Sequence, residues 1–74
     1  MPLSVATWNI NSVRLRLPIV RRFLAEFQPD VLCLQEIKCA DELFPADAFR
    51  DAGYGHIAIS GQKGYHGVAT ISRR

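Results

Sequence analysis

Two short polar clusters contain the residues of this 74-residue chain whose types suit metal chemistry. Asn9 stands near the end of one apolar run, and Glu36 directly follows Gln35 at the end of the next. Amide and carboxylate oxygens are ligands that Mg²⁺ prefers, and this ion takes only one or two carboxylates and keeps several waters. We therefore interpret Asn9 and Glu36 as candidate ligands of Mg²⁺, with Mn²⁺ as an alternative ion.

The segment between these clusters is patterned like a helix, so the sequence predicts a β-α-β unit. We expect strands at residues 3–10 and 30–36, and a helix that begins near Pro18 and ends before Pro29. Such crossovers join parallel strands, and open α/β sheets bind their ligands at the carboxyl ends of those strands. Asn9 and Glu36 should therefore meet at this edge of the sheet.

The surroundings of Glu36 leave alternatives open. Alternation along the strand places Glu36 on the same face as Leu32 and Leu34, which should be the core, where a carboxylate is costly unless it is paired or binds a metal. A salt bridge to Lys38 or to an arginine between residues 14 and 22 is the alternative to metal binding. Asn11 either orients the metal ligands or simply caps the turn, and the cap is the favoured interpretation.

An acidic loop, a short helix near residues 45–52 and an antiparallel hairpin of strands at 56–60 and 68–72 should follow. The hairpin loop contains Gly61, Gly64 and Gly67, but no helix follows it, which argues against a P-loop or a dinucleotide-binding loop. Lys63 could neutralise a phosphate, and Tyr65 could pack against a sugar or a base. An ordinary hairpin tip is the alternative.

Composition limits the class of protein. The length allows one small domain, and 49% hydrophobic residues argue against disorder. The net charge of +2 is too small to identify a polyanion partner. No secretory signal and no run of membrane-spanning length are visible, so we expect a cytoplasmic protein without membrane contact. Because its strands should need cover on both faces, and the chain stops directly after one, we expect a chain truncated on its C-terminal side.

Three segments together resemble the exodeoxyribonuclease III family, which belongs to the endonuclease/exonuclease/phosphatase superfamily. They are residues 8–14, 29–38 and 62–69, and the resemblance runs in order from residue 5 to residue 73. The first two motifs occur throughout the superfamily, whereas the Gln-Lys-Gly-aromatic hairpin points to this member. The resemblance implies a DNase I-like four-layer α/β sandwich, of which residues 1–74 would be the N-terminal portion of a single domain.

The resemblance also implies roles for individual residues. Asn9 and Glu36 match the family's metal site, and Asn11 and Lys38 match positions beside it. The positions that match DNA-binding ones, either directly or as part of the hairpin motif, are Arg14, Lys63, Gly64 and Tyr65. No residue of the chain matches the family's catalytic tyrosine, aspartate, asparagine or histidine, so none is assigned as catalytic.

The resulting hypothesis is a fragment of a magnesium-dependent DNA-repair nuclease, inactive on its own. The complete enzyme would be a monomer that degrades double-stranded DNA from its 3′ ends and cleaves at abasic sites. One alternative is a fragment of a superfamily phosphatase or phosphodiesterase that acts on inositol phosphates or lipids. The other is a non-catalytic DNA-binding module. Arg14 and the hairpin at residues 62–67 favour DNA.

Overall fold

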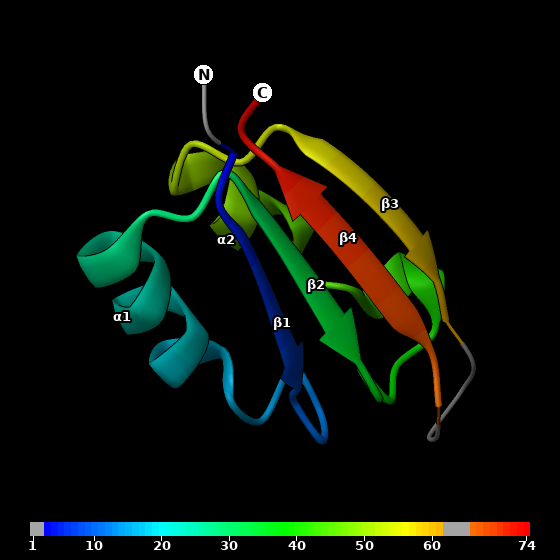
Figure 1. Cartoon of the computed structure of the whole chain (residues 1–74). Helices are drawn as coiled ribbons and strands as arrows, with labels where there is room; N and C mark the ends of the chain where they lie inside the picture. Colours follow the sequence, from blue (N-terminus) through cyan, green and yellow to red (C-terminus); the bar gives the residue numbers. More distant parts are fainter. Residues whose placement is uncertain (1–2, 62–65) are drawn as a thin grey trace.

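A computed structural model describes residues 3–61 and 66–74 of the chain, which form one sheet with helices on one of its faces (Figure 1). Among these residues no helix combines the length and the apolar character that crossing a membrane requires. In chain order the elements are β1 (Val5–Asn9), α1 (Leu17–Phe27), β2 (Val31–Gln35), a 3-10 turn η1 (Asp41–Leu43), α2 (Ala46–Asp51), β3 (His56–Ser60) and β4 (Val68–Ser72).

The strands follow the order β1-β2-β4-β3 across the sheet. β1 and β2 run parallel, with Val5 beside Val31 and Asn9 beside Gln35, as the β-α-β pattern predicted. β4 runs antiparallel to both of its neighbours, β2 and β3. The hairpin of β3 and β4 is therefore confirmed with its predicted bounds, and the structure adds that β4 lies between β2 and β3.

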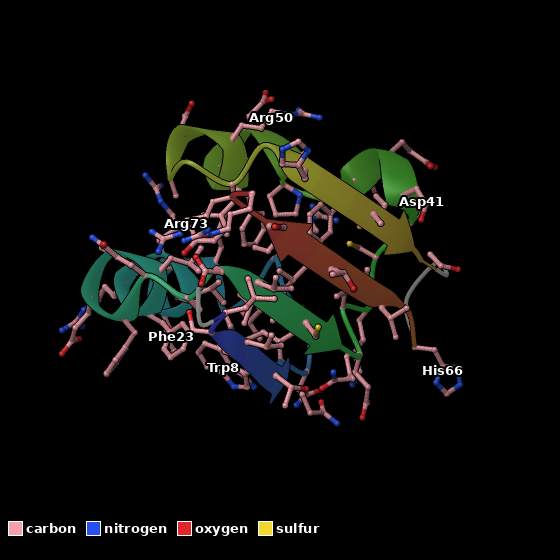
Figure 2. The ribbon with its side chains drawn as sticks, turned by 45° about the horizontal axis from the view of Figure 1, so that its top comes forward. Trp8, Phe23, Asp41, Arg50, His66 and Arg73 are labelled. Carbon is pink, nitrogen blue, oxygen red and sulfur yellow. The ribbon has the colours of Figure 1, made fainter. Side chains whose placement is uncertain are left out.

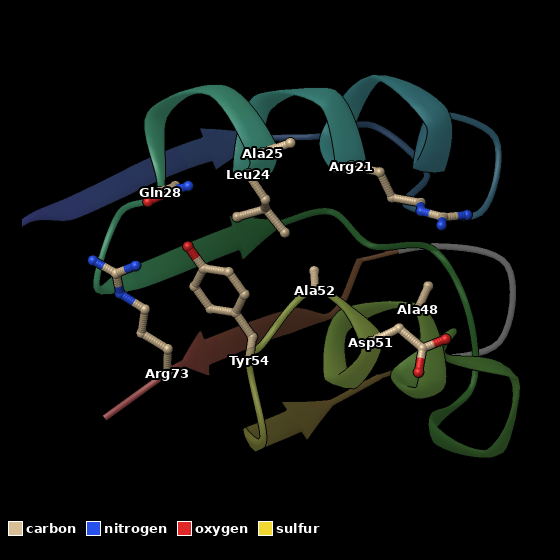
Figure 3. Close-up of a pocket in the computed structure, with 9 residues that line it drawn as sticks. All are labelled: Arg21, Leu24, Ala25, Gln28, Ala48, Asp51, Ala52, Tyr54 and Arg73. Carbon is tan, nitrogen blue, oxygen red and sulfur yellow. The ribbon is translucent and has the colours of Figure 1, made fainter.

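The core lies between the sheet and the layer formed by α1 and α2 (Figure 3). Each strand turns alternate residues toward this layer, which is the period-2 pattern of a sheet covered on one face. The opposite face, which carries Val5 and Val68, is exposed in the described structure. The buried hydrophobic side chains of the core are Ile10, Val13, Val20, Leu24, Leu32, Leu34, Ile37, Cys39, Phe44, Phe49, Tyr54, Ala69 and Ile71.

Several element boundaries differ from the predicted ones. The first two strands are shorter than expected at both ends, because Ser4 contacts Asp30 and the backbone turns left-handed at Glu36. α1 does carry Pro18 in its first turn, and Gln28 ends the helix in a left-handed conformation just before Pro29. α2 occupies Ala46–Asp51, slightly inside the predicted range, and the turn η1 was not anticipated.

Asp30 joins both ends of the chain at the edge where β1 and β2 begin. Its carboxylate accepts hydrogen bonds from the backbone N–H of Ser4 at 2.9 Å and from the guanidinium groups of Arg73 and Arg74 at 3.2 and 2.8 Å. The Ser4 N–H, followed by these arginines, holds the pKa of the Asp30 carboxyl well below its ordinary value. Asp30 was predicted only as part of a strand, and in the structure its side chain links residues near both ends of the chain.

Candidate metal site

The structure brings Asn9 and Glu36 together. Asn9 is the last residue of β1, and Glu36 is the first residue after β2. The side-chain amide of Asn9 donates a hydrogen bond from Nδ2 to Oε2 of Glu36 at 2.7 Å. Two residues that are 27 positions apart in sequence thus meet where parallel strands end, which is the arrangement expected from the β-α-β pattern.

The expectation that Glu36 lies on the core face of the sheet was wrong. Its backbone is left-handed, with φ of 53°, so the alternation that buries Leu32 and Leu34 does not extend to it. The Glu36 side chain is half-buried and reaches Asn9, whose side chain is exposed. The predicted alternative of a salt bridge is not seen either: among the described residues Glu36 forms no ion pair.

The loops that follow β1 and β2 are joined along their backbones. The N–H groups of Ile10, Ser12 and Val13 donate to the carbonyls of Gln35, Glu36 and Ile37 at 2.9 to 3.0 Å. Left-handed backbone conformations occur on both loops, at Asn11, Ser12, Glu36 and Lys38. Such conformations cost of order 1 kcal/mol or more at non-glycine residues and tend to cluster at functional sites. The backbone contacts between the two loops therefore hold these residues in conformations that they do not favour by themselves.

Lys38 and Asn11 make a second side-chain contact between the same loops. Nζ of Lys38 donates to Oδ1 of Asn11 at 2.5 Å, two residues beyond the pair of Asn9 and Glu36 on each loop. Asn11 therefore receives a hydrogen bond from another loop, which favours the orienting role over a simple cap. The contact fixes where Glu36 leaves its strand, because Lys38 lies only two residues further on.

The base of the hairpin packs against this region. The N–H of Lys38 donates to the carbonyl of His66 at 2.9 Å, and that of Ile37 donates to Gly67 at 3.2 Å. Gly67 has φ of 91°, and a Cβ there would lie 2.8 Å from the Ile37 side chain, so only glycine suits the position. Lys63, Gly64 and Tyr65, the predicted DNA-binding residues of this hairpin, lie outside the described residues.

Arg14 is exposed on the loop that carries Asn11. It forms no ion pair among the described residues, so its guanidinium is available to an anion. Burial raises the pKa of the Cys39 thiol, and the positive charge of Arg14 partly opposes this shift. Arg14 thus belongs to the same edge of the sheet as Asn9 and Glu36.

Sequence reasoning missed two polar contacts near this edge. Nε2 of Gln35 donates to Oγ1 of Thr7 at 2.9 Å, so a second amide contact bridges β1 and β2 directly before the metal-site pair. Asp41 accepts the N–H of Gly61 at 2.6 Å and thereby anchors the start of the hairpin loop. Gln35 stands next to Glu36, so its position alone could have marked it as part of the polar edge. Nothing in the sequence indicated that Asp41 would contact Gly61.

The arrangement suits part of a magnesium site. Asn9 uses its amide nitrogen toward Glu36, which leaves the amide oxygen as a ligand beside a carboxylate that forms no ion pair among the described residues. Mg²⁺ commonly binds through one or two protein oxygens and several waters, so these two donors fit its requirements. Within the described ranges no group of three or more histidine, cysteine, aspartate or glutamate residues could hold a metal ion. Asn9 and Glu36 would therefore need water or further ligands to complete the coordination.

Comparisons with known proteins agree with the fold. The model of the family described as Endonuclease/Exonuclease/phosphatase matches residues 6–74. Exodeoxyribonuclease III of Haemophilus influenzae is 43% identical over 72 residues, which are 97% of this chain and 27% of that protein. The resemblance found from the sequence motifs is thereby confirmed.

Two solved structures extend this result to DNA-processing enzymes. An AP endonuclease from Archaeoglobus fulgidus is 47% identical, with a TM-score of 0.92 over 97% of this chain and 28% of its own. The 3′ phosphatase NExo from Neisseria, bound to a product DNA hairpin, matches with the same identity, TM-score and coverage. The DNase I-like fold class is therefore confirmed, and the chain spans about a quarter of the length of the relatives it matches.

Proposed function

Since the chain belongs to the endonuclease/exonuclease/phosphatase family of hydrolases, we propose that it is the N-terminal portion of a magnesium-dependent DNA-repair nuclease of the exodeoxyribonuclease III type. The observation that carries this proposal is the pair of Asn9 and Glu36 at the carboxyl edge of the sheet. The proposed substrates of a full-length protein are the 3′ ends and abasic sites of double-stranded DNA. We further propose that such a protein is a cytoplasmic monomer.

Each residue at this edge has a defined task in the proposal. Asn9 and Glu36 would hold Mg²⁺, or Mn²⁺ in its place, and the bound ion would supply a positive charge to polarise a phosphate oxygen and to offset the charge that develops on the leaving 3′ oxygen. Lys38 and Asn11 keep the two loops in register, so that the two ligand side chains stay in contact. Arg14, Lys63 and Tyr65, with Gly64 in the same hairpin, contact the DNA backbone. None of these residues transfers a proton.

Metal binding can be measured on the 74-residue chain itself. Paramagnetic Mn²⁺ should broaden the NMR signals of Asn9 and of the residues around Glu36, and Mg²⁺ should compete with it. A Glu36→Gln chain should lose the broadening because the amide removes the only negative charge of the pair. Broadening that survives this substitution, or that centres on the acidic residues Asp41 and Glu42, would contradict the proposed ligands.

We expect the 74-residue chain alone to have no nuclease activity. It supplies two of the proposed metal ligands and none of the family's proton-transfer groups. The test is incubation with Mg²⁺ and with duplexes that carry a nick, a 3′ end or an abasic site, followed by gel separation of the products. Cleavage that EDTA abolishes and that Glu36→Gln also abolishes would show that the chain is an enzyme by itself.

If Arg14 and Lys63 contact the DNA backbone as proposed, the affinity for duplex DNA should depend on the salt concentration in a defined way. In a full-length protein, Arg14→Ala and Lys63→Ala should each weaken duplex binding equally at all sequences and lower the slope of log K against log salt by about 1. The reason is that phosphate contacts release counterions but read no bases. Arg50→Ala is the matched control, because Arg50 lies on α2 away from His66 and pairs with Asp47 at 3.2 Å (Figure 2). An unchanged slope in either variant would remove that residue from the proposed interface.

A second candidate function is removal of a phosphate from DNA 3′ ends. It rests on the equal identity of 47% to an AP endonuclease and to a 3′ phosphatase, which shows that this chain does not separate the two activities. A full-length protein should be given duplexes with a 3′ phosphate or a 3′ hydroxyl. Release of inorganic phosphate without release of nucleotides would favour the phosphatase, and release of nucleotides from both would favour the exonuclease. Hydrolysis of inositol phosphates but of neither duplex would contradict both.

A further inference from the structure

The side chain of Gln35 lies beside both proposed metal ligands. Gln35 precedes Glu36 in the sequence, and across the sheet it is the register partner of Asn9. The two strands that carry them, β1 and β2, run side by side and end at the same edge (Figure 1). Register partners on parallel strands share a face of the sheet, so Asn9 and Gln35 lie together on the face opposite the buried Leu32 and Leu34.

The amide nitrogen of Gln35 is directed away from this edge. Nε2 donates to Oγ1 of Thr7 at 2.9 Å, and a longer contact of 3.5 Å joins the same nitrogen to the backbone carbonyl of Cys33. Because a carbonyl oxygen can only accept, the second contact distinguishes the nitrogen of this amide from its oxygen. Thr7 and Cys33 each lie two residues before the end of their strand, so the N–H groups of Gln35 point back along the sheet.

This direction matters because Asn9 must keep its own amide oxygen free. Asn9 donates from Nδ2 to Glu36, which leaves Oδ1 for a cation. An N–H group bound to Oδ1 would compete with the cation for that oxygen. Neighbouring strands lie about 4.8 Å apart, so a Gln35 side chain that reaches Thr7 diagonally can also reach Asn9 directly beside it. Of these two acceptors on β1, only Thr7 leaves the ligand oxygen free.

The strand on the other side of Gln35 provides an internal comparison. β4 places Val68 beside Gln35 and Thr70 beside Cys33. Thr70 therefore occupies on β4 the diagonal position that Thr7 occupies on β1. Its hydroxyl nevertheless makes no hydrogen bond among the described residues. Gln35 thus contacts one of two threonines on this face, and the other serves as a matched control.

We propose that Thr7 is a positioning residue of the metal site. Its hydroxyl holds the amide of Gln35 away from Asn9, so that Oδ1 of Asn9 stays available to Mg²⁺ while Nδ2 contacts Glu36. The inference rests on the proposed metal ligands and adds two residues that act behind them. It requires no free surface, because the contacts join neighbouring strands within one sheet, and it therefore applies to the 74-residue chain and to a longer chain alike.

NMR of the metal-free 74-residue chain tests the contact itself. The side-chain amide protons of Gln35 should show nuclear Overhauser contacts to Thr7. Thr7→Val removes the hydroxyl and suits a strand, so the fold should persist and the Gln35 contacts should move to Asn9. Thr7→Ser keeps the hydroxyl and should preserve the original contacts. Thr70→Val makes the same change on the same face of the sheet and should also preserve them.

Binding of Mn²⁺, measured by the broadening of the Asn9 signals, tests the consequence. Thr7→Val should raise the dissociation constant at least ~10-fold, as is usual when a partner behind a metal ligand is removed. Adding Gln35→Met to Thr7→Val should restore the affinity, because the competing N–H groups are then gone. A loss of packing would not be reversed in this way. Thr7→Ser and Thr70→Val should bind Mn²⁺ as the unchanged chain does.

Two results would overturn the proposal. One is a Thr7→Val chain in which the Gln35 amide does not approach Asn9, and the metal-free spectra decide this even where Mn²⁺ binding is weak. The other is a loss of affinity that Gln35→Met does not reverse. Failure of the proposed metal site looks different, because Glu36→Gln would then leave the broadening unchanged. Should valine disturb the circular dichroism spectrum, Thr7→Ala removes the same hydroxyl and takes its place in every comparison.

Discussion

In a full-length protein that contains these residues, replacing Glu36 with glutamine should lower the turnover number at least ~100-fold at limiting Mg²⁺, which corresponds to about 2.7 kcal/mol. The amide keeps the size of the side chain and can still contact Asn9, but it removes the negative charge from a hard-cation site. Because Glu36 is half-buried and lies outside the core, the folded structure should change little.

Steady-state kinetics over a range of Mg²⁺ concentrations measure this effect. Glu26→Gln is the matched control, since it makes the same chemical change on the exposed side of α1 and should leave turnover and the Mg²⁺ dependence as they were. Partial recovery of the Glu36→Gln enzyme at high Mg²⁺ is expected if the loss arises from weaker metal binding. Near-normal turnover at limiting Mg²⁺ would show that Glu36 is not a ligand.

The second large effect concerns the stability of the 74-residue chain. Leu32→Ala should lower its free energy of unfolding by ~2–5 kcal/mol, because Leu32 is fully buried on β2, an inner strand of the sheet. A single core in a chain of this length seldom supplies more than about 3–5 kcal/mol of stability, so this variant should be unfolded in a large part of its population or close to unfolding.

Urea titration measures the free energy of unfolding, and the fluorescence of Trp8, the single tryptophan, follows the folded and unfolded fractions. Leu43→Ala is the control: the same atoms are removed from a side chain that is 51% exposed, and the cost should stay within ~0.5 kcal/mol. Both variants must be compared at one protein concentration, since self-association would add to the measured stability. Equal costs for the two substitutions would mean that the core does not lie between β2 and the helices.

Local patterns were sufficient to predict most of this fold. The apolar runs that end at Asn9 and Gln35, with a helical pattern between them, predicted parallel strands and the meeting of Asn9 with Glu36. The glycine-rich segment between two apolar runs predicted the hairpin of β3 and β4. These predictions succeeded because periodicity and turn residues act over a few neighbouring positions, and because the connection between two parallel strands fixes which of their ends meet.

What the sequence did not predict depends on contacts between distant residues. The left-handed backbone at Glu36 is held by its carbonyl contact with Ser12 and by the Lys38 contacts with Asn11 and His66, and alternation along a strand cannot anticipate such a turn. The role of Asp30 depends on Ser4 and Arg73, which approach it only in the folded chain. The insertion of β4 beside β2 likewise follows from packing of the whole sheet.

The strand order also determines when the sheet can form during protein synthesis. β4 is the last of these four strands to leave the ribosome, yet it lies between β2 and β3 and, among the described residues, is the strand that joins them in the sheet. Until residues 68–72 have emerged from the exit tunnel, β3 has no partner, and β2 can pair only with β1. The β-α-β unit can therefore assemble while the chain is still growing, whereas the second half of the sheet must wait. During that interval the inner edge of β2 is exposed, and chaperones that bind nascent chains would meet it there.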